Sequence, residues 1–242
     1  MNDRRGAHVS LNNKVALVTG GAGALGSVIA QRLATEGARV FVASRQREVQ
    51  RHRSDPPNAQ IASIKADVTD EADVVRLYDE ILAASGHIDI VVNAVGGFLP
   101  EKPLEDVSAK EWDSMMNINL RSSFLSTREA LRRMKGREYG RIINLSAMGG
   151  VNPTPGRAAY AISKAGVSIL TEVVAREQKG RGITVNAIAP GIIATPANLQ
   201  SMPGEDPGKW VKPEEIADLV CYLCSSAGSA ISGTTIKVYG GV

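Results

Sequence analysis

A short buried strand that runs into a glycine-rich turn restricts the fold of this chain more than any other feature. Residues 14–19 form an apolar, strand-like run, and residues 20–26 (GGAGALG) follow it directly. An amphipathic helical pattern to about Glu36 and a second strand at 39–43 come next. Without side chains in the turn, backbone N–H groups and a helix N-terminus can approach a pyrophosphate. The segment predicts the first βαβ unit of a dinucleotide-binding sheet.

Strand-like and helical segments continue to alternate along the chain. Further strands are expected at 61–66, 88–92, 141–146, 183–189 and 236–238. Helical patterns separate them at 72–85, 108–134, from before Tyr160 to about 179, and at 213–225. We therefore predict an α/β fold in which residues 11–242 form a single domain with a doubly wound parallel sheet. Residues 1–10 are expected to be a flexible tail, and residues 48–58 a surface connection.

Composition narrows the class of protein. Apolar residues make up 43% of the 242 residues and aromatic residues only 4%, so the core must be built mainly from aliphatic side chains. The net charge is only +3 and the basic residues are scattered, which disfavours nucleic acid as a partner. Cys221 and Cys224 lie three apart in a predicted helix and are expected to be core residues. No signal peptide or membrane-spanning run is apparent, so we expect a cytoplasmic protein without a membrane partner and without a metal site.

The tip of the second strand bears on the choice of cofactor. Dinucleotide sites usually place an acidic residue there to bind the ribose 2′-OH, whereas this chain has Ser44 and Arg45. A hydroxyl and a bidentate guanidinium would suit a 2′-phosphate, although Arg45 could equally be a solvated loop residue. Ser44 and Arg45 at the end of the second strand therefore favour NADP(H) as the cofactor, and NAD(H) stays possible.

Three further polar residues end or interrupt apolar segments. Asp67 follows the third strand, where it could accept a hydrogen bond from an adenine amino group or cap the next helix. Asn93 follows the fourth strand and begins another glycine-containing turn. Asn119 lies inside an apolar helical stretch, so it is either a satisfied structural amide or part of a polar site.

Tyr160 and Lys164 lie four apart on one predicted helix and so share one face of it. A nearby ammonium favours the phenolate and lowers the pKa of a tyrosine, which helps that phenol to exchange a proton with a substrate. The pair therefore suits the interconversion of a carbonyl and an alcohol. Taken alone, however, this spacing is also common for a core residue and its solvated neighbour.

In their order and spacing, these residues resemble the short-chain dehydrogenase/reductase family over about residues 10–242. The resemblance implies the strand order 3-2-1-4-5-6-7, a homodimer or homotetramer, and NAD(P)-dependent reduction of a carbonyl or oxidation of an alcohol. It implies that Tyr160 is the general acid, that Lys164 binds the nicotinamide ribose, and that Asn119 holds a water that passes protons to Lys164. The cofactor-binding residues it implies are Gly20, Ala22, Ala24, Leu25, Gly26, Ser44, Arg45, Asp67, Val68, Asn93, Ala94, Val95, Tyr160, Lys164, Pro190, Gly191, Ile193 and Thr195.

The family's catalytic serine is the most important departure from this pattern. It usually lies thirteen residues before the tyrosine, and that position is Ala147 here. Ser146 is one residue short, and successive strand residues point to opposite faces. Ser146 would become the catalytic serine only if the loop carried one extra residue, and we retain it as a candidate on that condition.

Three functions stay open on the sequence. The first is a ketone or 3-oxoacyl reductase similar to oxoacyl-carrier-protein reductases. The second is a quinonoid dihydropteridine reductase, because that branch keeps the tyrosine and lysine without the serine and its turns resemble residues 95–98 and 238–240. The third is a non-catalytic NADP-binding protein. The short segment between Thr195 and Pro213 disfavours long acyl substrates.

Overall fold

The structure, a computed structural model, describes residues 9–45 and 61–241; residues 1–8 of the predicted tail and the predicted connection at 48–58 lie outside these ranges. Within them, seven strands form one parallel sheet in the order β3-β2-β1-β4-β5-β6-β7, which confirms the predicted topology. The strands are β1 (Val15–Thr19), β2 (Arg39–Ser44), β3 (Ile61–Lys65), β4 (Ile90–Asn93), β5 (Gly140–Leu145), β6 (Ile183–Pro190) and β7 (Thr235–Val238).

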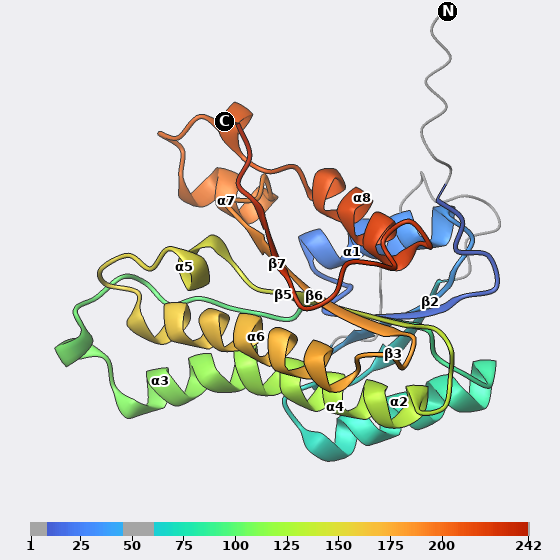
Figure 1. Ribbon diagram of the computed structural model, residues 1–242. Helices are drawn as coiled ribbons and strands as arrows, with labels where there is room; N and C mark the ends of the chain where they lie inside the picture. Colours follow the sequence, from blue (N-terminus) through green and yellow to red (C-terminus); the bar gives the residue numbers. More distant parts are fainter. Residues whose placement is uncertain (1–8, 46–60, 242) are drawn as a thin grey trace, which may run out of the picture.

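Helices cover both faces of the sheet. Helices α1 and α8 pack on one face, and α2, α4 and α6 pack on the other (Figure 1). The helical segments are α1 (Ala24–Thr35), α2 (Glu71–Ser85), η1 (Leu104–Asp106), α3 (Ala109–Met115), η2 (Met116–Arg121), α4 (Ser122–Met134), α5 (Met148–Val151), α6 (Ala158–Glu177), α7 (Pro196–Ser201), η3 (Pro207–Lys209) and α8 (Pro213–Cys224).

Strand β1 shows why polar and apolar residues do not alternate along the central strands. All five of its residues are buried, with Ala16 and Val18 packed in the α1–α8 layer and Val15 and Leu17 in the opposite layer. A parallel strand covered on both faces needs apolar side chains at every position. Burial of these side chains fixes the sheet between its two helical layers.

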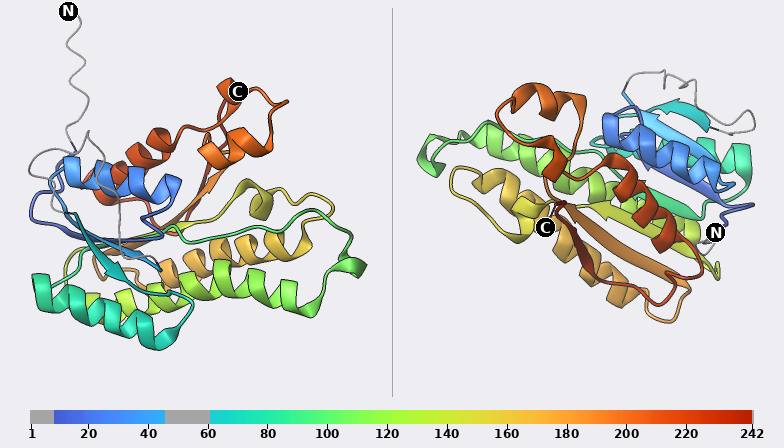
Figure 2. Two further views of the ribbon diagram at one scale, coloured as in Figure 1. Left: turned by 180° about the vertical axis from the view of Figure 1, so that it is seen from behind. Right: turned by 90° about the horizontal axis from the view of Figure 1, so that it is seen from above.

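The carboxyl end of β1 is the point where the strand order reverses. Thr19 is the register partner of Ala43 on one side and of Asn93 on the other, so the chain leaves β1 between two diverging connections. Such a switch point opens a crevice beyond the strand ends. Figure 2 shows α5, α7 and the start of α3 gathered beyond this same edge of the sheet.

Two predicted segments differ in detail from the observed ones. The helix expected at 108–134 is interrupted, because η2 is one π-helical segment between α3 and α4. The predicted polar connection before Pro213 contains a short helix, α7, which Thr195 caps. Among the described helices, α6 is apolar and long enough to cross a membrane, with a mean hydropathy of 1.3, but it packs against the sheet as a core helix.

Candidate active site

A cleft of about 620 Å³ lies beyond the carboxyl ends of β1 to β4. It brings together several of the residues predicted to bind a cofactor, from four separate turns. Its lining residues are Gly20, Ala22, Gly23, Ala43, Ser44, Arg45, Ala66, Asp67, Val68, Thr69, Ala94, Val95, Gly96, Ser114, Asn117 and Ile118.

The glycine turn holds β1, α1 and the β4 turn close together. Gly20 has a φ of 69°, and a Cβ at that position would lie 3.1 Å from the backbone nitrogen of Val95. A Cβ on Gly26 would lie 2.3 Å from the Gly20 carbonyl oxygen, so a side chain there would push α1 away from the turn. No side chain of the described residues caps the N-terminus of α1. The first-turn N–H groups thus have no side-chain acceptor at the N-cap, and Gly23 beside them lines the cleft, so the turn suits a phosphate.

The tips of β2 and β3 supply opposite charges to the cleft wall. Asp67 accepts hydrogen bonds from the backbone N–H of Thr69 at 2.9 Å and from its hydroxyl at 2.7 Å. These bonds, together with the nearby positive charge of Arg45, hold the pKa of Asp67 below its usual value, against the effect of burial. Asp67 is therefore a fixed carboxylate that also orders its own turn, while exposed Arg45 lines the same cleft.

Asn93 differs from its neighbours Ala94 and Val95, which line the cleft. Its side chain is 2% exposed and donates to Thr127 Oγ1 at 3.1 Å and to Asn144 Oδ1 at 2.8 Å. The amide therefore bonds inside the protein and links β4 to α4 and β5. Its Oδ1 is buried and has no partner among the described residues, so the Nδ2 bonds alone fix the direction of the side chain.

Lys164 reaches from α6 to Gly96, at the edge of the cleft, without lining the cleft itself. Its side chain is 5% exposed, and Nζ donates to the Leu145 carbonyl oxygen at 2.8 Å. A Cβ added to Gly96, which lines the cleft, would lie 3.0 Å from this Nζ, so the glycine leaves room for the ammonium. Burial lowers the pKa of Lys164 to about 8.

Tyr160 lies one turn before Lys164 on α6, half-buried. Burial raises the pKa of the Tyr160 phenol, and the positive charge that opposes this rise is Arg157. The sequence-based expectation that Lys164 lowers this pKa is therefore wrong for this structure. The reason is that burial dominates at the phenol, whereas the Lys164 ammonium is turned toward Leu145 and Gly96.

Asn119 joins the π-helical segment to both the β4 turn and α6. Its Nδ2 donates to the Gly97 carbonyl oxygen at 3.0 Å and to Ser163 Oγ at 3.1 Å, and its Oδ1 accepts from Gly97 N at 3.0 Å. Ser163 Oγ in turn donates to the Tyr160 carbonyl oxygen at 2.7 Å. The fully buried amide is satisfied and fixes the helix that carries the Tyr–Lys pair.

Ser146 does not approach the reacting groups through its hydroxyl. Its Oγ lies 2.9 Å from the Lys164 carbonyl oxygen and 2.9 Å from Ser168 Oγ, both on α6, and the residue is 3% exposed. The condition under which Ser146 was retained as a catalytic candidate is thus not met, because its hydroxyl joins β5 to α6. Ala147, at the N-cap of α5, occupies the position thirteen residues before Tyr160.

The segment after β6 lies outside the cleft and packs against β7 and the residues before α8. Gly191 N donates to the Val238 carbonyl oxygen, Ile193 bridges to Val211, and the Thr195 hydroxyl caps α7. Ten of the residues predicted to bind the cofactor do not line the cleft: Ala24, Leu25, Gly26, Asn93, Tyr160, Lys164, Pro190, Gly191, Ile193 and Thr195.

Eight residues that line the cleft were not predicted to bind the cofactor: Gly23, Ala43, Ala66, Thr69, Gly96, Ser114, Asn117 and Ile118. For Thr69 the sequence offered a local pattern, because a threonine two residues after an aspartate commonly closes a turn by donating to the aspartate carboxylate.

Taken together, the switch-point crevice, the uncapped helix behind a glycine turn, and half-buried Tyr160 one turn from buried Lys164 are typical of an α/β oxidoreductase that binds a dinucleotide. A family model described as enoyl-(acyl carrier protein) reductase matches residues 20–242. The chain belongs to the short-chain dehydrogenase/reductase family, whose members use nicotinamide cofactors.

Individual relatives match nearly the whole chain. Cyclopentanol dehydrogenase of Comamonas testosteroni is 34% identical, covering 96% of this chain and 97% of its own. The 3-oxoacyl-acyl-carrier-protein reductase FabG of Aquifex aeolicus is 31% identical, covering 97% and 99%. The crystal structure of gox2181 superposes with a TM-score of 0.85 at 30% identity, covering 96% of each chain.

Proposed function

We propose that the protein is an NADP(H)-dependent reductase that converts a ketone or 3-oxoacyl-type carbonyl to an alcohol, with Tyr160 as the general acid. The observation that carries this proposal is the position of the Lys164 ammonium beside Gly96, one helical turn from Tyr160. Among the relatives, the names of both a carbonyl reductase and an alcohol dehydrogenase support this reaction class.

The bound cofactor supplies the hydride, and the chain's own residues handle the proton. Because burial raises the pKa of Tyr160, its phenol carries its proton at neutral pH, as the acid of a reduction must. The Lys164 ammonium is poised to donate to the nicotinamide ribose. Asn119 positions both residues through Ser163 and the Gly97 turn.

NADP(H) is favoured as the cofactor by the charges of the cleft wall. Arg45 lines the cleft at the tip of β2, where an acidic residue would repel a 2′-phosphate. The guanidinium supplies donors and positive charge for that phosphate instead.

A second candidate, reduction of a quinonoid substrate such as a quinonoid dihydropterin, is favoured by one observation. Ala147 carries no hydroxyl at the position of the family's catalytic serine, and Ser146 bonds to α6. Loss of one donor to the developing oxyanion costs about 10²–10³ in rate at an unactivated carbonyl. A quinonoid substrate develops less charge on oxygen and depends less on that donor.

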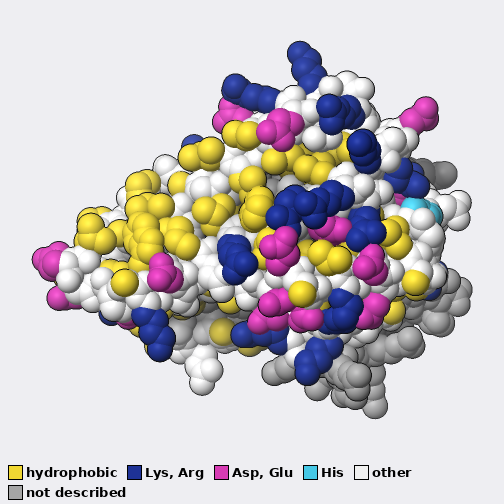
Figure 3. All heavy atoms as spheres, turned by 90° about the horizontal axis from the view of Figure 1, so that it is seen from below, with side chains coloured by type: hydrophobic (Ala, Val, Ile, Leu, Met, Phe, Trp, Pro, Cys, Tyr) yellow, Lys and Arg dark blue, Asp and Glu magenta, His cyan; other side chains and the backbone are white. Residues whose placement is uncertain are grey.

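Self-association and a cytoplasmic location also belong to this proposal. Exposed apolar side chains lie on the α4–α6 face, and Figure 3 shows hydrophobic side chains gathered over one part of it. They include Phe124, Ile162, Ile169 and Val173. Covering such a face in a homodimer or homotetramer would remove it from water. Light scattering after size exclusion measures the assembly.

NADPH consumption across ketones, quinones and quinonoid pterins tests the function. Turnover of ketones supports the first candidate, and turnover confined to quinonoid substrates supports the second. No turnover of any substrate, despite NADPH binding, would leave the chain a non-catalytic NADP-binding protein and refute both.

A further inference from the structure

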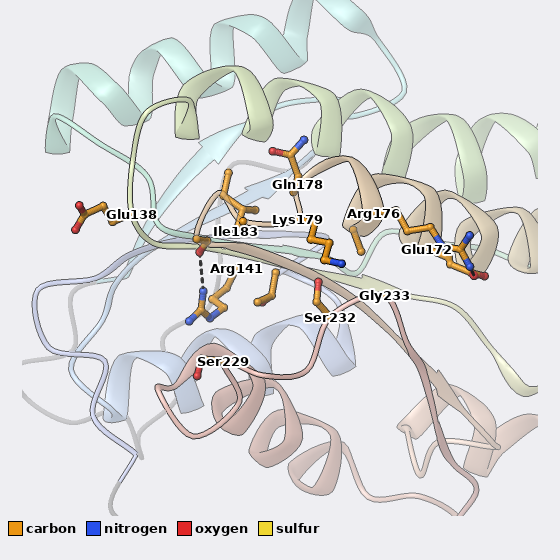
Figure 4. A pocket seen from close by; sticks show the side chains of 14 residues that line it. Glu138, Arg141, Glu172, Arg176, Gln178, Lys179, Ile183, Ser229, Ser232 and Gly233 are labelled. Atoms are coloured by element: carbon orange, nitrogen blue, oxygen red, sulfur yellow. Dashed lines mark hydrogen bonds and ion pairs between the residues drawn. The ribbon is translucent and has the colours of Figure 1, made fainter.

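A second pocket, of about 650 Å³, lies at the amino ends of β5 and β6, which is the opposite edge of the sheet from the active site (Figure 4). Strands, the end of α6 and the loop before β7 contribute to it. Its lining includes Arg141, Arg176, Lys179, Thr184, Ser229 and Ser232.

Arg141 is a buried cation at the base of this pocket. It is 5% exposed, stacks at 4.2 Å on the Tyr139 ring, and donates through Nη1 to the carbonyl oxygens of Gly140 at 2.8 Å and Gly182 at 3.2 Å. No carboxylate of the described residues lies within ion-pair distance, and Nε has no acceptor among them. A buried charge without a counter-ion is unfavourable, so an anion bound beside this guanidinium would stabilise it.

Thr184 presents a second unsatisfied group at the same place. It is 7% exposed, lines the pocket, and its Oγ1 has no hydrogen-bond partner in the described part of the chain. Arg141 and Thr184 are register partners in β5 and β6, so their side chains leave the sheet on the same face. Each of two adjacent strands therefore holds a buried polar atom without a partner among the described residues, and both residues line the same pocket.

The rim of the pocket adds charge of the same sign. Lys179 is exposed there, and Figure 4 shows its side chain extending toward Ser232. Glu172 is neutralised by its ion pair with Arg176. The Glu138 carboxylate extends away from the other labelled side chains in Figure 4.

We propose that this pocket binds a small oxyanion, either a carboxylate or a phosphate group, between Arg141 and Thr184. A guanidinium offers two parallel donors to such a group, and the threonine hydroxyl supplies a third. The ammonium of Lys179 would face the solvent side of the bound group. This site is separate from the cofactor cleft, because the two lie at opposite edges of the sheet.

Titration calorimetry with inorganic phosphate, and separately with acetate, tests the proposal at constant ionic strength. The full-length protein is compared with Thr184→Val, which keeps the β-branched shape and removes the hydroxyl. Arg141→Lys keeps the charge and removes the Nε donor, and circular dichroism checks that both variants fold. Arg45→Ala is the matched control, because phosphate can also enter the cofactor cleft.

Saturable binding that weakens about 10-fold or more in Thr184→Val and persists in Arg45→Ala is the expected result, since a hydrogen bond to a charged group carries about that much affinity. Tighter binding of phosphate than acetate assigns a phosphorylated ligand, and the reverse order a carboxylate. The proposal is overturned if neither anion binds saturably. It is also overturned if binding is unchanged in Thr184→Val and Arg141→Lys, or disappears in Arg45→Ala.

Discussion

Replacing Lys164 with methionine should stabilise the fold while removing function. Lys164 is 5% exposed, and burial lowers its pKa from 10.5 to about 8. At about 1.4 kcal/mol for each pKa unit, keeping this ammonium charged inside the protein costs about 3 kcal/mol at neutral pH. Methionine fills a similar volume without a charge, so it removes this cost. It also leaves the Leu145 carbonyl oxygen without its donor, which destabilises the variant by about 1–3 kcal/mol.

The pH dependence separates the charge effect from the lost hydrogen bond. Below pH 8 the lysine is protonated in both the folded and the unfolded chain, so its full cost is present. Between pH 8 and 10.5 the folded protein releases this proton first, and wild-type stability rises relative to the variant. The difference in unfolding free energy between Lys164→Met and wild type should therefore shift by about 3 kcal/mol toward wild type over this range.

Urea unfolding followed by circular dichroism, at neutral pH and above pH 10.5, measures this difference. Lys110→Met, at an exposed lysine on α3, is the control and should show no comparable pH-dependent change. A Lys164→Met difference that stays constant with pH would refute the burial argument.

Substitutions at three further places in the site have defined outcomes: at Arg45, at the Ser146–Ala147 pair and at Arg157. Arg45→Ala should lower kcat/KM for NADPH far more than for NADH, and a wild-type preference for NADH would contradict the cofactor assignment. Ala147→Ser should raise the rate on unactivated ketones by up to about 10²–10³-fold and change quinonoid turnover little, whereas Ser146→Ala should leave the chemistry intact; inactivation by Ser146→Ala alone would return the catalytic role to Ser146. Arg157→Gln removes the charge that lowers the Tyr160 pKa, so the alkaline limb of the pH profile for reduction should move to higher pH, and Arg157→Lys should leave it in place.

The sheet and its glycine turn were predictable because they are local patterns repeated along the chain. Strands β1, β4 and β6 are each followed within three residues by a glycine, and the helix carrying Tyr160 follows β5 as expected. The strand order came from resemblance to a family and was confirmed by the pairing of β1 with both β2 and β4.

Side-chain direction was harder to predict at the ends of these strands. Asn93 and Ser146 both end strands that are buried on two faces, and such strands give no alternation from which direction could be read. Their polar groups bond to α4, β5 and α6, which are distant in sequence. The raised pKa of Tyr160 likewise depends on burial by the assembled fold.

The π-helical segment η2 also escaped prediction. It differs from the flanking α-helices by one residue in the hydrogen-bonding pattern, and the apolar residues around Asn119 suit either form. Asn119 lies in this segment, and its amide donates to Gly97 and Ser163.

Turnover by Tyr160→Phe tests the central claim most directly. Phenylalanine keeps the ring and removes only the hydroxyl, so the fold and NADPH binding should persist. Steady-state NADPH oxidation on the best substrate of the wild type, with NADPH affinity measured by fluorescence, reports the two properties separately. We predict loss of nearly all turnover with cofactor affinity close to that of the wild type, and near-normal turnover would show that Tyr160 is not the acid.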